Sequence, residues 1–379
     1  MKIFHISDLH IGKKFKEFSM LDDQEYILSE IIKTVDIEIP DCVVIAGDIY
    51  DKTIPPTDAV ILFDKFLYDL SKRKIPTLII SGNHDSPERV SFGGRLMEAE
   101  GIYISPVFNG EIKPVVLQDE IGDVNFYLFP FVKPVQVRKY FPDKKIESYQ
   151  DAVKTVIDSL ELKSDSRNVL VAHQFVTGST LGNSEEFMIG GAENVDAELF
   201  MDFDYTALGH IHHPQNVGSE KIRYCGSPLK YHFDEHDKER SFTIAELGKK
   251  GELSVREILI KPKREMRYYK GSYDRLTSKN FYENVSRDDY VFITLTDEED
   301  IPDASLKLKK IYPNLLQLFY DNSRTQSPSV IRSEIRNEKL PPIQIFTEFY
   351  KNQCNHDMTS AQKEIMEKLI NKIWESEIL

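Results

Sequence analysis

The chain has 379 residues and a formal net charge of −14 at pH 7, from 48 basic and 62 acidic side chains. Its hydrophobic fraction of 41% and charged fraction of 29% are those of a globular protein, which excludes a disordered or collagen-like chain. The acidic balance argues against tight autonomous binding to nucleic acid, because such binding depends on phosphate neutralisation by Lys and Arg. If the substrate is a polyphosphate, metal cations or a partner must supply the attraction.

Length and hydropathy also bound the organisation of the protein. A single hydrophobic core rarely grows past about 250–300 residues, so we expect one large domain and one or two smaller pieces. No apolar run approaches the ~20 residues that span a bilayer, and Asp8 interrupts any signal-peptide core, so we expect a soluble, cytoplasmic protein. Cys42, Cys225 and Cys354 lack CxxC spacing, which favours packing residues over a disulfide or a thiolate metal site.

Residues 1–261 alternate short apolar runs with longer amphipathic stretches, a pattern that predicts strands separated by helices. The predicted strands are Lys2–Ile6, Cys42–Ala46, Thr77–Ile80, Val124–Phe129, Val169–Ala172 and Thr206–Leu208. Helical spacing of apolar residues predicts helices over Leu21–Ile39 and Thr57–Lys74. The continuously apolar second and third strands indicate a sheet covered on both faces. The sequence therefore predicts a large α/β domain over residues 1–261.

The composition changes near Lys261, where basic and aromatic residues gather in an otherwise acidic chain. They are Lys261, Lys263, Arg264, Arg267, Tyr268, Tyr269 and Lys270. This cluster is typical of either a solvated linker or a contact with a phosphate backbone, and both interpretations stay open. Beyond it, Tyr290–Thr296 and Leu315–Tyr320 predict strands that flank a helix over Ala304–Tyr312. We therefore expect a second domain, with a basic linker, over residues 262–335.

Residues 336–379 predict two helices after Pro341-Pro342. In the second helix, apolar residues recur every three to four positions: Ile365, Met366, Leu369, Ile370, Ile373 and Trp374. A stripe this apolar needs a partner. From the residues alone, a contact within this chain and a docking face for another subunit are both open.

Side chains that bind metals follow five of the predicted strands. They are Asp8 and His10, Asp48, Asn83 with His84 and Asp85, His173, and His210 with His212. In open α/β sheets, ligand sites lie beyond the carboxyl ends of the strands, so we expect these groups to converge. A single histidine at a strand end is usually an ordinary polar residue, but this number of them is not explained that way. We expect His5 to be buried in the first strand and His213, His232, His236 and His356 to lie at the surface.

Imidazole and carboxylate donors together suit Mn²⁺, Fe²⁺ or Zn²⁺, and the absence of thiolates disfavours a structural zinc site. These donors are too many for one ion, whereas two ions that share one carboxylate would use them. A metal pair about 3.5–4 Å apart activates water at neutral pH and stabilises the attacking and leaving oxygens of a phosphoryl displacement. The pattern therefore predicts a two-metal phosphoesterase.

Five motifs occur in an order that resembles the calcineurin-like metallophosphoesterases. They are Ser-Asp-Leu-His at Ser7–His10, Gly-Asp-Ile-Tyr-Asp at Gly47–Asp51, Gly-Asn-His-Asp at Gly82–Asp85, the lone His173, and Ala-Leu-Gly-His-Ile-His at Ala207–His212. Together with Cys-Gly-Ser-Pro-Leu-Lys-Tyr at Cys225–Tyr231, they are similar to the SbcD family, the nuclease subunits of bacterial SbcCD complexes. The resemblance implies a four-layer α/β/β/α sandwich with a small α/β capping domain and a C-terminal helical extension.

The resemblance also implies a role for each matching residue. One ion would be held by Asp8, His10 and His212, the other by Asn83, His173 and His210, and Asp48 would bridge the two. His84 matches a catalytic histidine that is not a ligand, and Asp51 matches the carboxylate that orients this histidine in phosphatase relatives. Related nucleases commonly place a histidine near Asp51, which leaves the partner of His84 open. Asp85 either orients its loop or touches a metal.

In function, the resemblance implies a DNA nuclease with two Mn²⁺ ions per chain, with Mg²⁺, Fe²⁺ or Zn²⁺ as alternatives. Double-strand exonuclease and single-strand or hairpin endonuclease activities are expected, in DNA repair, recombination and replication. The chain has no P-loop motif, so any ATP dependence would come from an SbcC-like, SMC-type ATPase bound through residues 336–379. A homodimer within a heterotetramer is expected, and Lys263, Arg264 and Arg267 are candidate DNA contacts. The alternatives are a stand-alone phosphoesterase for a small nucleotide or a phosphoprotein, and an inactive scaffold.

Overall fold

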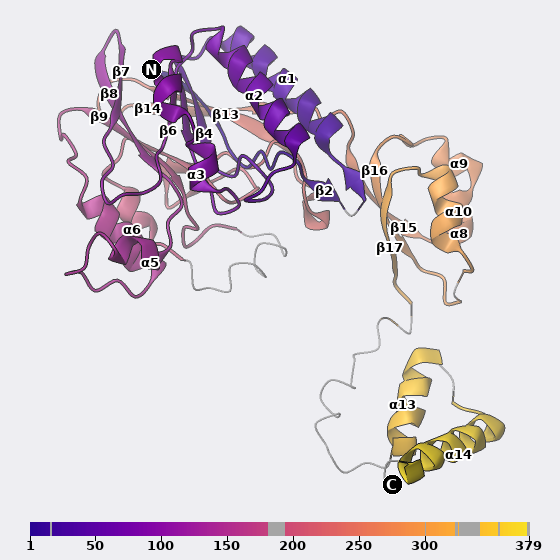
Figure 1. Ribbon diagram of the computed structural model, residues 1–379. Coiled ribbons are helices and arrows are strands. Elements are labelled where there is room, and N and C mark those ends of the chain that lie inside the picture. Colours follow the sequence, from indigo (N-terminus) through magenta and orange to yellow (C-terminus); the bar gives the residue numbers. More distant parts are fainter. Residues whose placement is uncertain are drawn as a thin grey trace. The chain divides into compact units, whose positions relative to one another are not determined.

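The computed structural model describes residues 1–15, 17–180, 194–299, 301–322, 325, 342–354 and 357–376 (Figure 1). By its internal contacts the chain divides into two compact units, Met1–Glu265 and Met266–Leu379. Within the described ranges, no helix is both long and apolar enough to cross a membrane.

The first unit contains two six-stranded sheets. The first sheet has the order β14-β13-β1-β4-β5-β6. Its strands are β1 (Lys2–Ile6), β4 (Cys42–Ala46), β5 (Thr77–Ile80), β6 (Ile102–Ile104), β13 (Ser241–Leu247) and β14 (Leu253–Leu259). Strands β1, β4, β5 and β6 are parallel, and β13 runs antiparallel to both β1 and β14. The carboxyl ends of the parallel strands therefore meet at one edge of this sheet.

The second sheet has the order β11-β12-β10-β9-β8-β7. Its strands are β7 (Val115–Asp119), β8 (Gly122–Phe129), β9 (Arg167–His173), β10 (Tyr205–Gly209), β11 (Gln215–Val217) and β12 (Ser219–Tyr224). The four central strands β8, β9, β10 and β12 are parallel, whereas the outer strands β7 and β11 are antiparallel to their neighbours. This sheet therefore also presents a set of parallel carboxyl ends.

Helices cover the outer faces of the two sheets, which gives the predicted four-layer α/β/β/α order (Figure 1). Helices α1 (Leu21–Glu38) and α2 (Thr57–Ser71) lie on the side of the first sheet. Helix α6 (Tyr149–Asp158) packs on the second sheet, where Val153 and Val156 join a cluster with Leu170 and Leu208. Buried side chains of both sheets, including Val44 and Val171, form the core between them. Short elements link these parts: β2 (Lys14–Phe15), β3 (Phe18–Ser19), α3 (Pro87–Val90), α4 (Gly94–Met97) and α5 (Pro134–Arg138).

The second unit begins with a three-stranded parallel sheet of order β15-β16-β17. Its elements are β15 (Met266–Gly271), α8 (Tyr273–Thr277), α9 (Lys279–Tyr282), β16 (Tyr290–Leu295), α10 (Ala304–Ile311) and β17 (Leu315–Tyr320). The predicted β-α-β unit is present. The basic stretch needs a correction, however, because half of the predicted linker forms strand β15, with Met266 buried. Helices α13 (Pro342–Cys354) and α14 (Ser360–Ser376) follow and contact each other.

A buried ion pair joins strands β7 and β9. The two terminal nitrogens of Arg167 lie 2.6 and 2.8 Å from the carboxylate oxygens of Asp119, and the side chains are only 5% and 12% exposed. The guanidinium holds the pKa of Asp119 well below its usual range, although burial opposes this shift. Arg167→Ala removes two hydrogen bonds to a charged group but leaves the Met1 amino group 2.8 Å from Asp119, so we expect it to lower the free energy of unfolding of the first unit by about 2 kcal/mol.

Urea unfolding followed by far-ultraviolet circular dichroism measures this loss. Tryptophan fluorescence would not report on the first unit, because the only tryptophan, Trp374, lies in the second unit. The matched control is Arg73→Ala, which removes the exposed pair with Asp36 and should cost at most about 1 kcal/mol. The ionised Asp119 carboxylate contributes to the stability of the folded state above about pH 4, the pKa of this group in the unfolded chain. This contribution is lost as the pH falls towards the lower pKa of the folded state. Equal losses for the two variants at pH 7 would contradict the assignment.

Candidate metal centre

The predicted ligands lie where five parallel strands end. Asp8 and His10 follow β1, Asp48 follows β4 and Asn83 follows β5. In the second sheet, His173 is the last residue of β9, and His210 and His212 follow β10. Four of these residues, Asp8, His10, Asp48 and His210, have positive φ angles of 52°, 43°, 50° and 103°. Such backbone conformations cost about 1–3 kcal/mol each for residues other than glycine and persist only where the surroundings enforce them.

Main-chain hydrogen bonds enforce this geometry by joining the loops after β1 and β4. The Asp8 amide donates to the Gly47 carbonyl and the His10 amide donates to the Asp48 carbonyl, both at 3.0 Å. Glycine is required where the loops touch: a Cβ atom on Gly82 would lie 2.2 Å from Asp48 Oδ1, and one on Gly209 would lie 2.0 Å from the Ala46 carbonyl. The glycines of the motifs therefore permit a close approach that any side chain would prevent.

Asp8, His10 and His212 form the first ligand set. Their potential ligand atoms all lie within 4.8 Å of one another, and the two Nε2 atoms of His10 and His212 are 3.1 Å apart. All three side chains are buried. Burial raises the pKa of Asp8 to about 6, and nearby Asp48 adds to this rise while histidines oppose it. A bound cation would stabilise both carboxylates, which is the electrostatic fit expected of a metal site.

Asn83, His173 and His210 form the second ligand set. The Asn83 Oδ1 atom lies 2.9 Å from His173 Nε2 and 3.0 Å from His210 Nδ1. His173 Nδ1 lies 2.8 Å from the Ala46 carbonyl oxygen, to which it can donate its proton. This hydrogen bond would leave the Nε2 lone pair of His173 directed towards the site, as is usual for histidines that bind metals.

Asp48 lies between the two sets. Its Oδ2 atom is 3.7 Å from His10 Nε2 in the first set and 3.3 Å from His173 Nε2 in the second. Its Oδ1 atom accepts a hydrogen bond of 2.9 Å from the His84 amide. Although burial alone would raise the pKa of Asp48, the neighbouring His173 and His10 lower it well below its usual range. The residues present therefore fit two cations that share one carboxylate.

The expectation for Asp51 needs a correction. His84 Nδ1 lies 3.0 Å from the main-chain carbonyl oxygen of Asp51, whereas the Asp51 carboxylate forms an ion pair of 2.8 Å with Lys13 Nζ. The side chain of Asp51 therefore does not orient His84; its backbone does. The His84 ring lies 4.8 Å from the His10 ring, centroid to centroid, so His84 borders the first ligand set.

Of the two interpretations of Asp85, the structure favours the one in which it orients the loop. Its carboxylate accepts hydrogen bonds of 3.1, 2.9 and 2.9 Å from the amides of Ile49, Tyr50 and Gly82. Burial raises its pKa to about 6, and Asp48 adds to this rise. Asp85 thus fastens the loop after β5 to the loop after β4.

Two residues of the segment between β12 and β13 also reach the site and were not predicted to do so. Glu235 Oε1 lies 2.8 Å from His212 Nδ1. His232, expected at the surface, is half-buried and stacks on the His212 ring with centroids 5.7 Å apart. Their signal in the sequence is only proximity to the motif Cys225–Tyr231. His5 is buried as predicted, and its Nδ1 atom lies 2.8 Å from the Tyr205 hydroxyl; His356 lies outside the described residues.

The candidate DNA-binding cations stay predictions. Lys263 is exposed, and the Arg264 guanidinium forms an ion pair of 2.6 Å with Asp23. Arg267 lies 3.2 Å from Asp289 within the second unit. Two of the three cations are thus engaged by carboxylates of the chain itself.

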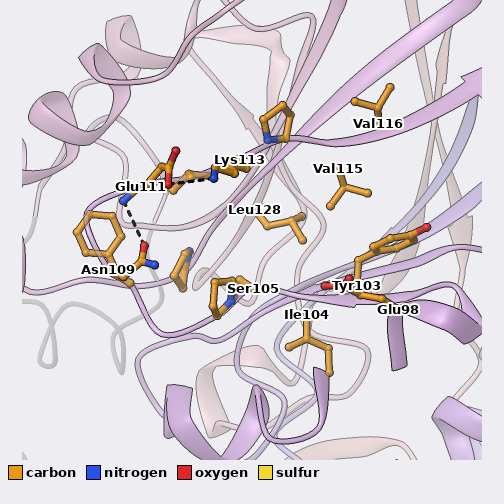
Figure 2. A pocket seen from close by; sticks show the side chains of 15 residues that line it. Glu98, Tyr103, Ile104, Ser105, Asn109, Glu111, Lys113, Val115, Val116 and Leu128 are labelled. Atoms are coloured by element: carbon orange, nitrogen blue, oxygen red, sulfur yellow. Dashed lines mark hydrogen bonds and ion pairs between the residues drawn. The ribbon is translucent and has the colours of Figure 1, made fainter. Parts of the chain in front are cut away.

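A cavity of about 470 Å³ lies beside β6, β7 and β8, and none of the predicted ligands lines it (Figure 2). Its charged residues include Glu111 and Lys113, an exposed pair 3.4 Å apart. Catalytic pockets instead bring a few polar groups together in a largely buried cleft. The cavity therefore offers no rival to the metal centre.

Comparison with known proteins places this site in a family. Residues 1–214 match the family model of the calcineurin-like phosphoesterases, and residues 262–353 match a model described as the type 5 capsule protein repressor C-terminal domain. The SbcD subunit of nuclease SbcCD from Staphylococcus epidermidis is 32% identical, with 100% of both chains covered. Its counterpart from Staphylococcus saprophyticus is 34% identical, with 99% of both covered. The chain belongs to the SbcD family.

Residues 1–214 match the calcineurin-like phosphoesterase model and the full chain matches SbcD nuclease subunits, so the predicted fold and the predicted enzyme class, a hydrolase of phosphate esters, are both confirmed. Two solved structures are also similar, each at 13% identity over 68% of this chain. One is a Thermus thermophilus protein, covered over 98% of its length with a TM-score of 0.38. The other is a dimetal phosphatase from Danio rerio, covered over 95% with a TM-score of 0.44.

Proposed function

We propose that this chain is the nuclease subunit of an SbcCD-type complex and hydrolyses phosphodiester bonds of DNA with two Mn²⁺ ions. The observation that carries the proposal is the position of Asp48 Oδ2 within reach of one histidine from each ligand set. Full-length similarity to two SbcD proteins supports the choice of DNA over a small substrate. We further propose the division of labour predicted above, with nuclease residues 1–261, capping residues 262–335 and partner-binding residues 336–379.

Asp8, His10 and His212 would hold one ion, Asn83, His173 and His210 the other, and Asp48 both. When bound, the two metal ions would activate water and stabilise the negative charge that develops on the phosphate. In its protonated form His84 would donate a hydrogen bond from Nε2 to a phosphate or leaving oxygen, while its Nδ1–H donates to the Asp51 carbonyl oxygen at 3.0 Å. The side chain of His84 is part-exposed, which leaves room for a substrate. Asp85 and the Asp51 backbone would keep these loops in place.

The partner would bind through α13 and α14. Ile365 and Leu369 are 59% and 46% exposed, although they belong to the apolar stripe of α14. Exposed apolar stripes of this kind mark contacts with other proteins. We propose an SbcC-like, SMC-type ATPase as the partner, which would also supply the affinity for DNA that a chain of net charge −14 lacks.

The test is a cleavage assay on hairpin-ended and linear duplex DNA with Mn²⁺, with and without the ATPase partner. We expect cleavage of both substrates and a dependence on ATP only when the partner is present. A chain lacking residues 336–379 should keep the activity that needs no partner and lose the response to ATP. If that chain and the full chain cleave only a small phosphodiester, and never DNA, the nuclease proposal is wrong.

We also propose that two copies of the chain associate. Phe92 and Leu96, in the segment from α3 to α4, are each 82% exposed, and large apolar side chains exposed together are uncommon on monomers. Light scattering should give a dimer for the natural chain and a monomer for Phe92→Ser/Leu96→Ser. The control is Leu306→Ser, which removes a leucine that is 65% exposed in the second unit and should leave the dimer intact. A natural chain that is monomeric at micromolar concentration would contradict the proposal.

A further inference from the structure

The segment from Gly226 to Arg240, between β12 and β13, returns the chain to the metal centre. A short 3₁₀ turn, Phe233–Glu235, ends at a glutamate that is only 7% exposed. Buried carboxylates are rare unless they are paired, because loss of hydration disfavours the charge. The contacts of this side chain therefore indicate what it does.

Both oxygens of Glu235 are engaged. Oε1 lies 2.8 Å from His212 Nδ1, while Oε2 accepts hydrogen bonds of 2.7 Å from the Tyr231 amide and 2.5 Å from Arg240 Nη2. Arg240 also donates through Nη1 to the His212 carbonyl oxygen at 2.6 Å. One arginine thus fixes both the backbone of His212 and the carboxylate that contacts its ring.

The contact with Glu235 determines which ring nitrogen of His212 carries the proton. An ionised carboxylate only accepts hydrogen bonds, and buried Arg240 supplies the opposite charge that keeps it ionised. The proton of a neutral His212 ring must then sit on Nδ1. Its Nε2 atom, 3.1 Å from His10 Nε2, then carries the lone pair with which the ring would bind a cation.

We propose that Glu235 is the positioning residue of the first ligand set: it holds the His212 ring and its tautomer so that Nε2 is presented to the cation. The inference rests on the proposed function, because it treats His212 as a ligand. In the second set the corresponding contact of His173 is the neutral Ala46 carbonyl. The two sets therefore differ. Loss of the Glu235 charge should weaken binding of the cation at His212 and leave binding of the other cation unchanged.

The test compares the natural chain, Glu235→Gln and Glu257→Gln, each as the full chain stripped of metal. Glu257 is the matched control, because it also pairs with an arginine, Arg223, at 2.6 Å but contacts no predicted ligand among the described residues. Titration with Mn²⁺ by calorimetry should give two ions for the natural chain and the control. Glu235→Gln should bind one ion about 10–100-fold more weakly and the other within a few-fold.

A second readout needs no metal. Long-range ¹H–¹⁵N spectra of the metal-free protein should show His212 as the Nδ1–H tautomer in the natural chain and a mixture of tautomers in Glu235→Gln. If the natural chain binds two ions and Glu235→Gln keeps both affinities and the tautomer, the inference is wrong and the proposed function stands. If the natural chain binds no Mn²⁺, the proposed function fails as well. Should Glu235→Gln not fold, Glu235→Asp carries the test, since its shorter carboxylate should weaken the same ion.

Discussion

An Asp48→Ala variant should bind neither cation and should lose cleavage by more than about 10³-fold, beyond what removal of a single hydrogen-bond donor to a transition state costs. The reason is geometric. Asp48 Oδ2 lies 3.7 Å from a histidine of the first set and 3.3 Å from a histidine of the second, so its removal takes a donor from both sites at once. It also removes the acceptor of the His84 amide. Metal analysis of the purified variant by plasma mass spectrometry, beside a cleavage assay, measures both effects.

The matched control is Asp36→Asn, which removes an exposed carboxylate paired with Arg73 in the same unit. It should retain two ions and natural activity. Circular dichroism establishes that the Asp48→Ala chain is folded. A folded variant that stays loaded with two ions would show that Asp48 does not bridge, and a variant that loses only one ion would assign it to a single site.

Three strands of the first sheet, Lys2–Ile6, Cys42–Ala46 and Thr77–Ile80, could be predicted to the residue because they are short, mostly apolar and almost wholly buried. Cys42–Ala46 is apolar throughout, so its ends coincide with the ends of the apolar run. Strand β14 was not predicted. It lies at the edge of the sheet, and its apolar residues are interrupted by polar ones such as Arg256 and Glu257. Edge strands carry little hydrophobic signal, since one side of the strand faces solvent.

The candidate ligands could be predicted for a related reason: each follows a recognisable strand, and parallel strands deliver their ends to one place. Glu235 and His232 could not, because the segment that carries them returns to the site from an irregular turn with no periodic pattern. The partner of His84 was also hidden, since a main-chain carbonyl leaves no trace in the residue type. Sequence patterns thus located the groups proposed to touch the cations, whereas the groups that hold them in place required the fold.

A His84→Ala variant should keep both cations and lose cleavage by about 10²–10⁴-fold, the range expected for a general acid or base. His84 lies close enough to His10 and Asp48 for the three to hold a cation, so a ligand role is the alternative. Two observations favour catalysis. Its Nδ1 faces the Asp51 carbonyl at 3.0 Å, and its side chain is more exposed than His10, which suits contact with a substrate.

Two catalytic roles of His84 are possible: protonation of the leaving oxygen, or stabilisation of negative charge on the phosphate. A substrate whose leaving group needs no proton distinguishes them. With thymidine 5′-p-nitrophenyl phosphate, p-nitrophenolate leaves as a stable anion, so the loss caused by His84→Ala should shrink to less than about 10-fold if His84 protonates the leaving oxygen. A loss of similar size on both substrates would mean that His84 stabilises charge on the phosphate instead. Both results require that the variant binds two ions with natural affinity. If His84→Ala loses one of the two ions, His84 is a ligand. In that case His84, His10 and Asp48 would together have held the lost ion.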